Sequence, residues 1–169
     1  MRRDQRSEYR HHNSTAATRP MTIPWPPIIL MCVSTAAIVL HLFVPVNWPG
    51  VNDMPARLVG LGIGASGLLL ILWAASHLYR ARTTILPHKN ASVLVTSGPF
   101  ARFRNPIYLG DVMLLLGAAE LTKNIWFVPA AVIFAIIVTL VAILPEEHHL
   151  EEKFGADYQA YKARTRRWI

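Results

Sequence analysis

The chain has 169 residues, of which 53% are hydrophobic and only 16% are charged, whereas an ordinary soluble domain carries about 25% charged residues. With a mean hydropathy of +0.31, this balance excludes an ordinary soluble domain and favours one bundle of helices in lipid. The net charge of +7 would suit a nucleic-acid partner, but the basic residues are not gathered on one helix or stripe, so we expect no nucleic acid. The only cysteine, Cys32, excludes an intramolecular disulfide.

Residues 1–22 are polar and rich in arginine, and we expect a disordered basic segment or one that lies on an anionic membrane surface. The membrane domain is expected over residues 23–169. Its first apolar stretch, residues 27–44, is long enough for about 27 Å of helix, which nearly matches the hydrocarbon core of a bilayer. This stretch is too long for the apolar region of a signal peptide, so we expect a retained anchor.

Three further apolar stretches follow. Residues 57–79 contain four glycines, which would let a neighbouring helix approach closely. Residues 107–121 would form only about 22 Å of helix and carry Asp111 and Glu120, so this stretch either stops short of the far side or lies inside the bundle, with Glu120 exposed at the far end. Residues 125–144 are uncharged and reach about 30 Å. The sequence therefore predicts an all-α, multi-pass transmembrane helix bundle of about four spans.

The basic residues indicate how the bundle is oriented. Five lysines and arginines precede the first stretch, five lie between the second and third, and five follow the fourth, which leaves only Arg57 and Lys123 elsewhere. By the positive-inside rule, both termini and the loop over residues 80–105 are cytoplasmic. An even number of spans requires this arrangement of the termini.

The pattern changes to that of an amphipathic helix from Glu146 onward. Leu150, Phe154, Tyr158 and Tyr161 recur at steps of four, four and three, which puts them on one face of a helix. We expect a C-terminal amphipathic cytoplasmic helix, with its aromatic rings at headgroup depth and its basic residues against anionic lipid. The alternative is that this helix folds back as a lid over the loop between the second and third stretches.

Two motifs flank the third and fourth stretches. Residues 96–110 read TSGPFARFRNPIYLG, and residues 145–168 read PEEHHLEEKFGADYQAYKARTRRW. The first resembles the signature of the isoprenylcysteine carboxyl methyltransferase and phospholipid methyltransferase families, in which a glycine and an aromatic residue precede arginine, histidine or asparagine, proline and tyrosine. The second resembles the ending of these families, with paired glutamates, then FG, then two tyrosines. The resemblance implies a bacterial-type methyltransferase of the inner membrane that uses S-adenosylmethionine (SAM), with its cofactor-binding half over residues 83–169.

The resemblance also implies where the cofactor contacts fall. From the two motifs they would be Val93, Leu94, Val95, Phe100, Asn105, Pro106, Tyr108, Glu146 and Glu147. The chemistry agrees, because a helix that begins at Pro106 offers free N–H groups to the carboxylate of the donor, and Arg104 would add a bidentate contact. The glutamates would bind its ammonium. Alternatively, Arg104 is one more cytoplasmic basic residue, and the glutamates pair with Arg102 or Arg104.

Arg104, Asp111 and Glu147 are the residues expected to act in the reaction. Asp111 lies in an apolar stretch, where a carboxylate costs roughly 2.5–3.5 kcal/mol, so we expect it to face the bundle interior. There it would orient or deprotonate the acceptor, or pair with an arginine. His148 and His149 are neighbours that point to different sides of a helix, so we expect no metal site.

Departures from the family pattern leave the acceptor open. Leu144 and Pro145 stand where an arginine commonly precedes the glutamates, and the chain ends in RTRRWI without the common proline. The expected partners are membrane lipid and a lipophilic small-molecule acceptor, which enters between helices and is a lipid amine, a carboxylate, a thiol or a quinone-like molecule. Two other functions remain open: an NADPH-dependent membrane reductase resembling the steroid reductases, and a non-catalytic membrane scaffold. The sequence gives no oligomeric state.

Overall fold

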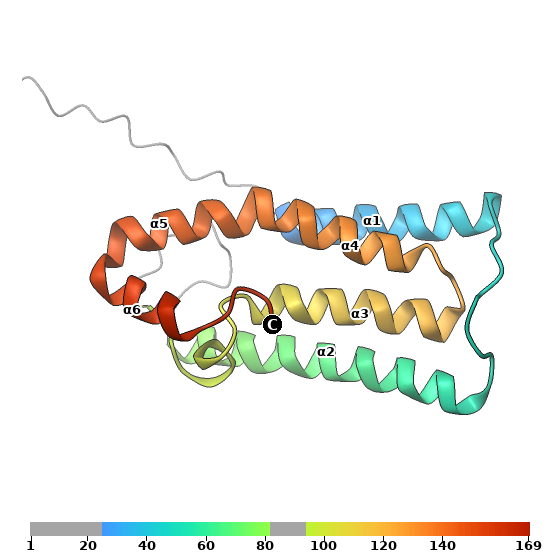
Figure 1. The fold of residues 1–169 in the computed structure, drawn as a ribbon, viewed down its shortest axis with the longest axis horizontal. Helices are drawn as coiled ribbons and strands as arrows, with labels where there is room; N and C mark the ends of the chain where they lie inside the picture. The colour runs from blue at the N-terminus through green and yellow to red at the C-terminus, as the bar shows by residue number, and fades with distance from the viewer. Residues whose placement is uncertain (1–24, 82–93) are drawn as a thin grey trace, which may run out of the picture.

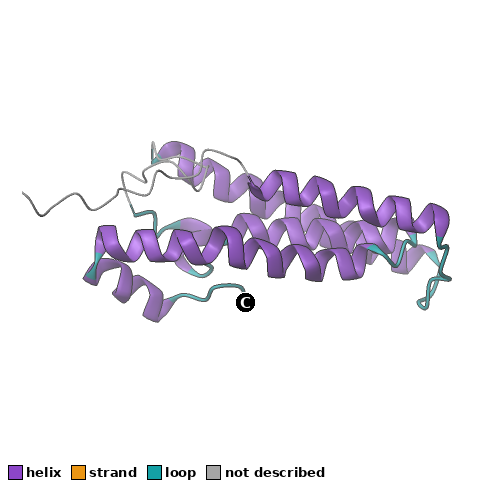
Figure 2. Ribbon diagram, turned by 90° about the horizontal axis from the view of Figure 1, so that it is seen from above, coloured by secondary structure: helices purple, strands orange, loops and turns teal. Residues whose placement is uncertain are grey.

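The computed structural model describes residues 25–81 and 94–169, and Figure 1 shows that its long helices run side by side in alternating directions. The predicted N-terminal segment and Val93 lie outside these residues. In chain order the elements are α1 (Trp25–Phe43), α2 (Met54–Arg80), the short 3-10 helix η1 (Gly98–Ala101), α3 (Pro106–Thr122), α4 (Phe127–Val138), the π-helical turn η2 (Thr139–Ile143), α5 (Leu144–Phe154) and α6 (Ala156–Arg164). Within the described ranges there is no strand (Figure 2), which agrees with the predicted all-helical fold.

Three helices are long and apolar enough to cross a membrane. They are α1 with 19 residues, α2 with 27, and the continuous helix of α4, η2 and α5 with 28. The third predicted stretch, α3, has 17 residues and reaches about 26 Å. It is therefore the shortest of the four, as the sequence predicted, and a count of four complete spans stays a prediction.

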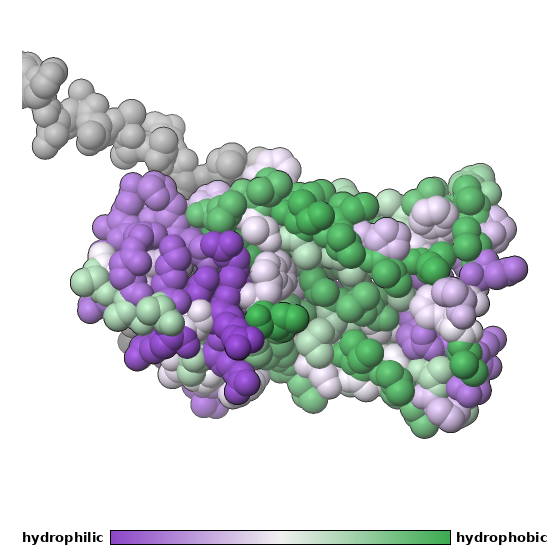
Figure 3. Space-filling view, viewed as in Figure 1, coloured by the Kyte–Doolittle hydropathy of each residue, from purple (hydrophilic) through white to green (hydrophobic). Residues whose placement is uncertain are grey.

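On the face that Figure 3 shows, apolar residues cover the middle of the bundle, and the end that carries α5 and α6 is polar. Large apolar side chains on the outward faces of α1 and α2 are exposed, including Met31 at 71% and Leu69 at 66%. In water such a surface would be unfavourable, but against lipid tails it is the surface that a bundle of helices requires.

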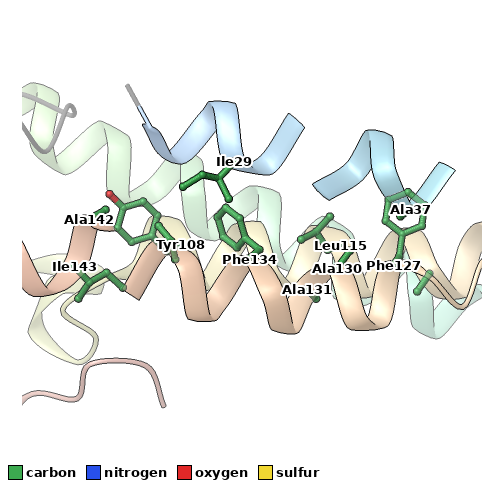
Figure 4. Packing of buried hydrophobic residues seen from close by; sticks show 12 residues of the cluster. Ile29, Ala37, Tyr108, Leu115, Phe127, Ala130, Ala131, Phe134, Ala142 and Ile143 are labelled. Atoms are coloured by element: carbon green, nitrogen blue, oxygen red, sulfur yellow. The ribbon is translucent and has the colours of Figure 1, made fainter. Parts of the chain in front are cut away.

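The core lies around α4, which packs against α1 on one side and α3 on the other. Phe134 and Val138 of α4 are fully buried, and Leu115 of α3 and Ile29 of α1 belong to the same cluster (Figure 4). The helix continues through η2 into α5 without a break, so the core and the polar end are parts of one rigid rod.

Glycines let α2 and α3 approach each other closely. A Cβ atom added to Gly117 of α3 would lie 2.7 Å from the Cα atom of Gly64 in α2, and one added to Gly67 would lie 2.7 Å from the carbonyl oxygen of Gly110. The predicted role of the glycine-rich second stretch is therefore confirmed. Because lipid gives two helices little hydrophobic reason to associate, this close backbone packing holds the pair together.

The far end of the bundle, where α3 meets α4, is closed by polar contacts. Lys123 ends α3 in a left-handed conformation, with φ of 56°. Its ammonium donates to the carbonyl oxygen of Val51 at 3.0 Å and pairs with Glu120. The Glu120 side chain is only 19% exposed, so its expected exposure at the far end is wrong: it lies against Gly60 of α2 and pairs with Lys123.

The C-terminal segment is not one helix, so the predicted continuous amphipathic helix is wrong. The chain turns at Gly155, whose φ of 50° ends α5, and α6 folds back beside α5 (Figure 2). Tyr158 and Tyr161 are consequently buried, at 1% and 4% exposure, instead of lying at headgroup depth. The alternative, in which the C-terminal segment folds back over the loop before α3, is correct for α6.

The α2–α3 contact yields a stability prediction. Gly117→Ala forces the two backbones apart, and we expect it to lower the free energy of unfolding by about 1–3 kcal/mol, the usual effect of overpacking. Gly62→Ala on α2 is the matched control, because a Cβ atom there would meet nothing within 4 Å. Thermal unfolding in detergent should show a lower Tm for the first variant only, and equal Tm values would contradict the role of the close approach.

Candidate functional site

The two motif segments meet at the polar end of the bundle, where the C-terminal tail runs beside the residues that lead into α3. The backbone N–H of Arg104 donates to the carbonyl oxygen of Arg166 at 2.8 Å. The backbone N–H of Arg166 donates to the carbonyl oxygen of Arg102 at 3.1 Å. These bonds form a parallel bridge between Phe103 and Arg166. Segments more than 60 residues apart in the sequence are thus held in register.

The carboxylate of Glu147 lies at the centre of this end. It accepts from the Nε of Arg104 at 3.1 Å, and from the Nε and Nη2 of Arg167 at 3.0 and 2.7 Å. The side chains of Arg104 and Glu147 are only 10% and 8% exposed. The hydrogen bond to Glu147 raises the pKa of the Arg167 guanidinium above its usual value. Two guanidinium groups therefore share one carboxylate, and two of the three side chains, those of Arg104 and Glu147, are largely buried.

Arg104 also holds the end of α6. Its Nη1 donates to the carbonyl oxygen of Thr165 at 2.6 Å and to that of Lys162 at 3.2 Å. These carbonyl groups belong to the last turn of a helix, where no backbone partner is available and a cation is favourable. Arg104 thus joins the start of α3, the helix α5 and the end of α6.

The tail is fixed by two more residues of the first motif. The side-chain amide of Asn105 donates to the carbonyl oxygen of Arg167 at 3.1 Å, and the carbonyl oxygen of Phe100 accepts from the hydroxyl of Tyr161 at 2.8 Å. Burial raises the pKa of Tyr161 to about 12, so its hydroxyl keeps the proton that it donates. Burial likewise raises the pKa of Tyr158, which lies beside it. Sequence reasoning missed this role of the two tyrosines, because their spacing suited a membrane surface equally well.

The adjacent glutamates have different surroundings. Both nearby arginines contact Glu147, and among the described residues neither contacts Glu146, which remains partly exposed. The alternative stated from the sequence, that the glutamates pair with an arginine, is therefore confirmed for Glu147 and Arg104. Arg102 takes part in this end of the bundle only through its backbone. Sequence reasoning did not identify Arg167 as a partner, because it stands in a run of basic residues that suggested contact with lipid.

The start of α3 provides a partial positive charge, opposite in sign to the charge of the glutamates. Asn105 is its N-cap but makes no side-chain capping bond, and Pro106 occupies the first turn. The first backbone N–H groups of a helix have no partner inside that helix, and they carry a partial positive charge. Of the remaining residues expected in the site, Phe100, Pro106 and Tyr108 are buried, and Leu94 and Val95 are half-buried.

Tyr108 connects the start of α3 to the carboxylates. Its ring belongs to the core cluster beside Ile143 (Figure 4). Asp111 follows Tyr108 by three residues on α3, so the two side chains lie on the same side of that helix. Asp111 is half-buried and forms no ion pair among the described residues, so its expected pairing with an arginine is absent there. In the described part of the chain, no group of three or more histidine, cysteine or acidic residues is arranged to hold a metal ion.

The groups at the polar end have the chemistry to match a small molecule that carries both charges of an amino acid. Glu146 can receive an ammonium group, and the first turn of α3 can receive a carboxylate. The aromatic residues Phe100 and Tyr108 belong to the same end of the bundle, and both are buried. Glu147, Arg104 and Arg167 hold the walls of this site in position.

Comparison with known proteins identifies the family. The family model described as phospholipid methyltransferase matches residues 55–157, more than half of the chain. A protein of Haemophilus influenzae, described only as an uncharacterized protein, is 33% identical over 63 residues, which is 37% of this chain and the whole of that protein. No solved structure matches the chain. With its three apolar helices of membrane-spanning length, the chain is an integral membrane protein, and it belongs to the phospholipid methyltransferase family.

Proposed function

We propose that the protein transfers a methyl group from S-adenosylmethionine to a lipophilic acceptor at the cytoplasmic face of the membrane. Membership of a methyltransferase family supports the reaction type. The observation that carries the proposal further is the contact between Arg104 and Glu147, which brings the two motifs together around one site. The concentration of basic residues at this end supports the cytoplasmic orientation, with both termini inside, and a bacterial inner membrane would have this topology.

The donor's charged groups divide between two elements in this proposal. Glu146 binds the ammonium, and the free N–H groups at the start of α3 bind the carboxylate. Phe100 and Tyr108 contact the adenosine or the sulfonium, for which an aromatic face is a suitable partner. Arg104 and Glu147 act as positioning residues, because their hydrogen bonds are already directed at each other and at the tail.

When bound, the donor supplies an activated methyl group, so the protein needs no covalent intermediate. The acceptor's nucleophile forms a bond to the methyl carbon while the bond from carbon to sulfur breaks, and the protein's task is to align the two and exclude water. For an amine acceptor, Asp111 receives the proton that the nitrogen releases, because it is a half-buried carboxylate about one turn along α3 from Tyr108. A carboxylate acceptor needs no such base.

Binding of each cofactor tests the reaction class. In purified protein in lipid nanodiscs, we expect saturable binding of radiolabelled S-adenosylmethionine and none of NADPH. Binding of NADPH alone would favour the reductase, and binding of neither, with tight binding of lipid, would favour the scaffold.

Glu146→Gln and Glu147→Gln should differ in what they change. Glu146→Gln removes the ammonium's partner without disturbing an arginine, so we expect donor affinity to fall at least tenfold with an unchanged Tm. Glu147→Gln leaves two guanidinium groups without their carboxylate, and breaking a buried pair costs about 3–5 kcal/mol. We therefore expect a large loss of Tm from the second variant. Equal effects of the two variants on Tm and on binding would contradict this division of roles.

Asp111→Asn tests the proton acceptor. The variant keeps its shape and should bind the donor normally, whereas general-base catalysis contributes about 10²–10⁴-fold to a rate. Methyl transfer from radiolabelled donor into a total membrane lipid extract should fall by a factor in this range. A full rate in the variant would remove Asp111 from the reaction and favour an acceptor that needs no base.

A further inference from the structure

The last turn of α2 carries a histidine, His77, whose imidazole is half-buried. Its Nδ1 lies 3.0 Å from the carbonyl oxygen of Trp73, one turn earlier in the same helix. Because a carbonyl oxygen only accepts, Nδ1 carries the proton of this hydrogen bond. The imidazole also meets the Trp73 ring nearly at right angles, at 78° with 5.9 Å between the centroids. These two contacts fix the orientation of the imidazole.

The far edge of this imidazole points at Gly98, the first residue of η1. A Cβ atom added to Gly98 would overlap with the Nε2 of His77, and it would lie 2.5 Å from Cδ2 and 2.7 Å from Cε1. The φ of Gly98 is 62°, in the left-handed region that favours glycine. The backbone of η1 thus rests directly on the His77 ring, and two separate constraints exclude a side chain at Gly98.

η1 is a single closed turn. The carbonyl oxygen of Pro99 accepts from the backbone N–H groups of Arg102 and Phe103, at 3.3 and 3.1 Å. Phe100 lies inside this turn, two residues after Gly98. Because a hydrogen-bonded turn moves as a unit, a change in the height of Gly98 above α2 is passed on to Phe100.

Phe100 is held from two sides. On the α6 side, its carbonyl oxygen accepts from the hydroxyl of Tyr161 at 2.8 Å. On the α2 side, η1 rests on His77 through Gly98. The Phe100 side chain is only 9% exposed, so close packing leaves it little freedom to adjust when η1 moves. His77 therefore helps to set where this aromatic ring lies.

We propose that His77 is a positioning residue for the donor site: its imidazole is a spacer of fixed length between α2 and η1, and it determines where Phe100 meets the donor. The contact of Phe100 with the donor rests on the proposed function. A misplacement of about 1 Å in a reacting site can cost about 10²-fold in rate. A spacer of the wrong length should therefore impair use of the donor even when the fold is intact.

Two substitutions of His77 change the length of the spacer differently. His77→Ala removes it, whereas His77→Gln places an amide near the position of Nε2. In purified protein in lipid nanodiscs, the dissociation constant of radiolabelled S-adenosylmethionine should rise about tenfold in His77→Ala and stay close to the wild-type value in His77→Gln. At saturating donor, His77→Ala should recover most of the wild-type rate, because the ring touches no reacting group. A lower Tm in both variants with unchanged donor affinity would identify a merely stabilising role and overturn the proposal.

Gly98→Ala tests the same contact from the side of η1. The new Cβ atom meets the imidazole, so donor affinity should fall, and the double variant with His77→Ala should recover part of that loss. Gly155→Ala is the control for the backbone, because Gly155 also has a positive φ, of 50°, and nothing lies within 4 Å of the added atom. Donor affinity should be unchanged in this control. Strictly additive effects of the substitutions at His77 and Gly98 would contradict the contact.

Amide hydrogen exchange without the donor separates this inference from the proposed function. The N–H groups of Arg102 and Phe103 should exchange several-fold faster in His77→Ala than in the wild type or in His77→Gln, because η1 has lost its support. Equal exchange in all three proteins, together with normal donor binding, overturns the role of His77 and leaves the proposed function standing. Faster exchange in His77→Ala, when the wild type binds no S-adenosylmethionine, contradicts the proposed function and supports the contact between His77 and η1.

Discussion

The carboxylate of Glu147, shared by Arg104 and Arg167, holds the polar end of this bundle together. A buried carboxylate is costly unless it is paired and hydrogen-bonded, and here each arginine comes from a different segment. The start of α3, the helix α5 and the tail are consequently fixed to one another. Displacing either arginine removes part of what compensates the buried carboxylate, and displacing α5 removes the carboxylate from both.

The membrane explains why the rest of the bundle is held differently. Lipid tails are as apolar as the helix surfaces, so burial alone gives α2 and α3 little reason to associate, and close packing of Gly64 against Gly117 takes its place. At the far end, the buried side chain of Asn124 donates to the carbonyl oxygen of Ala37 at 3.0 Å and so joins α1 to the start of α4. Polar contacts thus close both ends, and small residues hold the middle.

Much of the fold could be predicted from local pattern, and the contacts that depend on the tail could not. Apolar length predicted the helices to within a few residues, and the expectation that the two motifs meet at one end of the bundle is confirmed by the contact of Arg104 with Glu147. The break at Gly155 was missed because the helical spacing of Phe154, Tyr158 and Tyr161 continues across it. The pairing of Arg167 with Glu147 was missed because a basic tail suits lipid equally well, and only the fold decides which arginine turns inward.

The π-helical turn η2 explains how two neighbouring glutamates come to have different roles. Pro145 has no N–H to donate, so the ladder of hydrogen bonds must adjust just before it, and η2 is the adjustment. An extra residue in a turn rotates everything that follows by about 100° relative to the preceding helix. Adjacent residues also differ by about 100°, so that rotation decides which carboxylate faces the arginines. With η2 in place, Glu147 meets the tail, and among the described residues Glu146 contacts neither arginine.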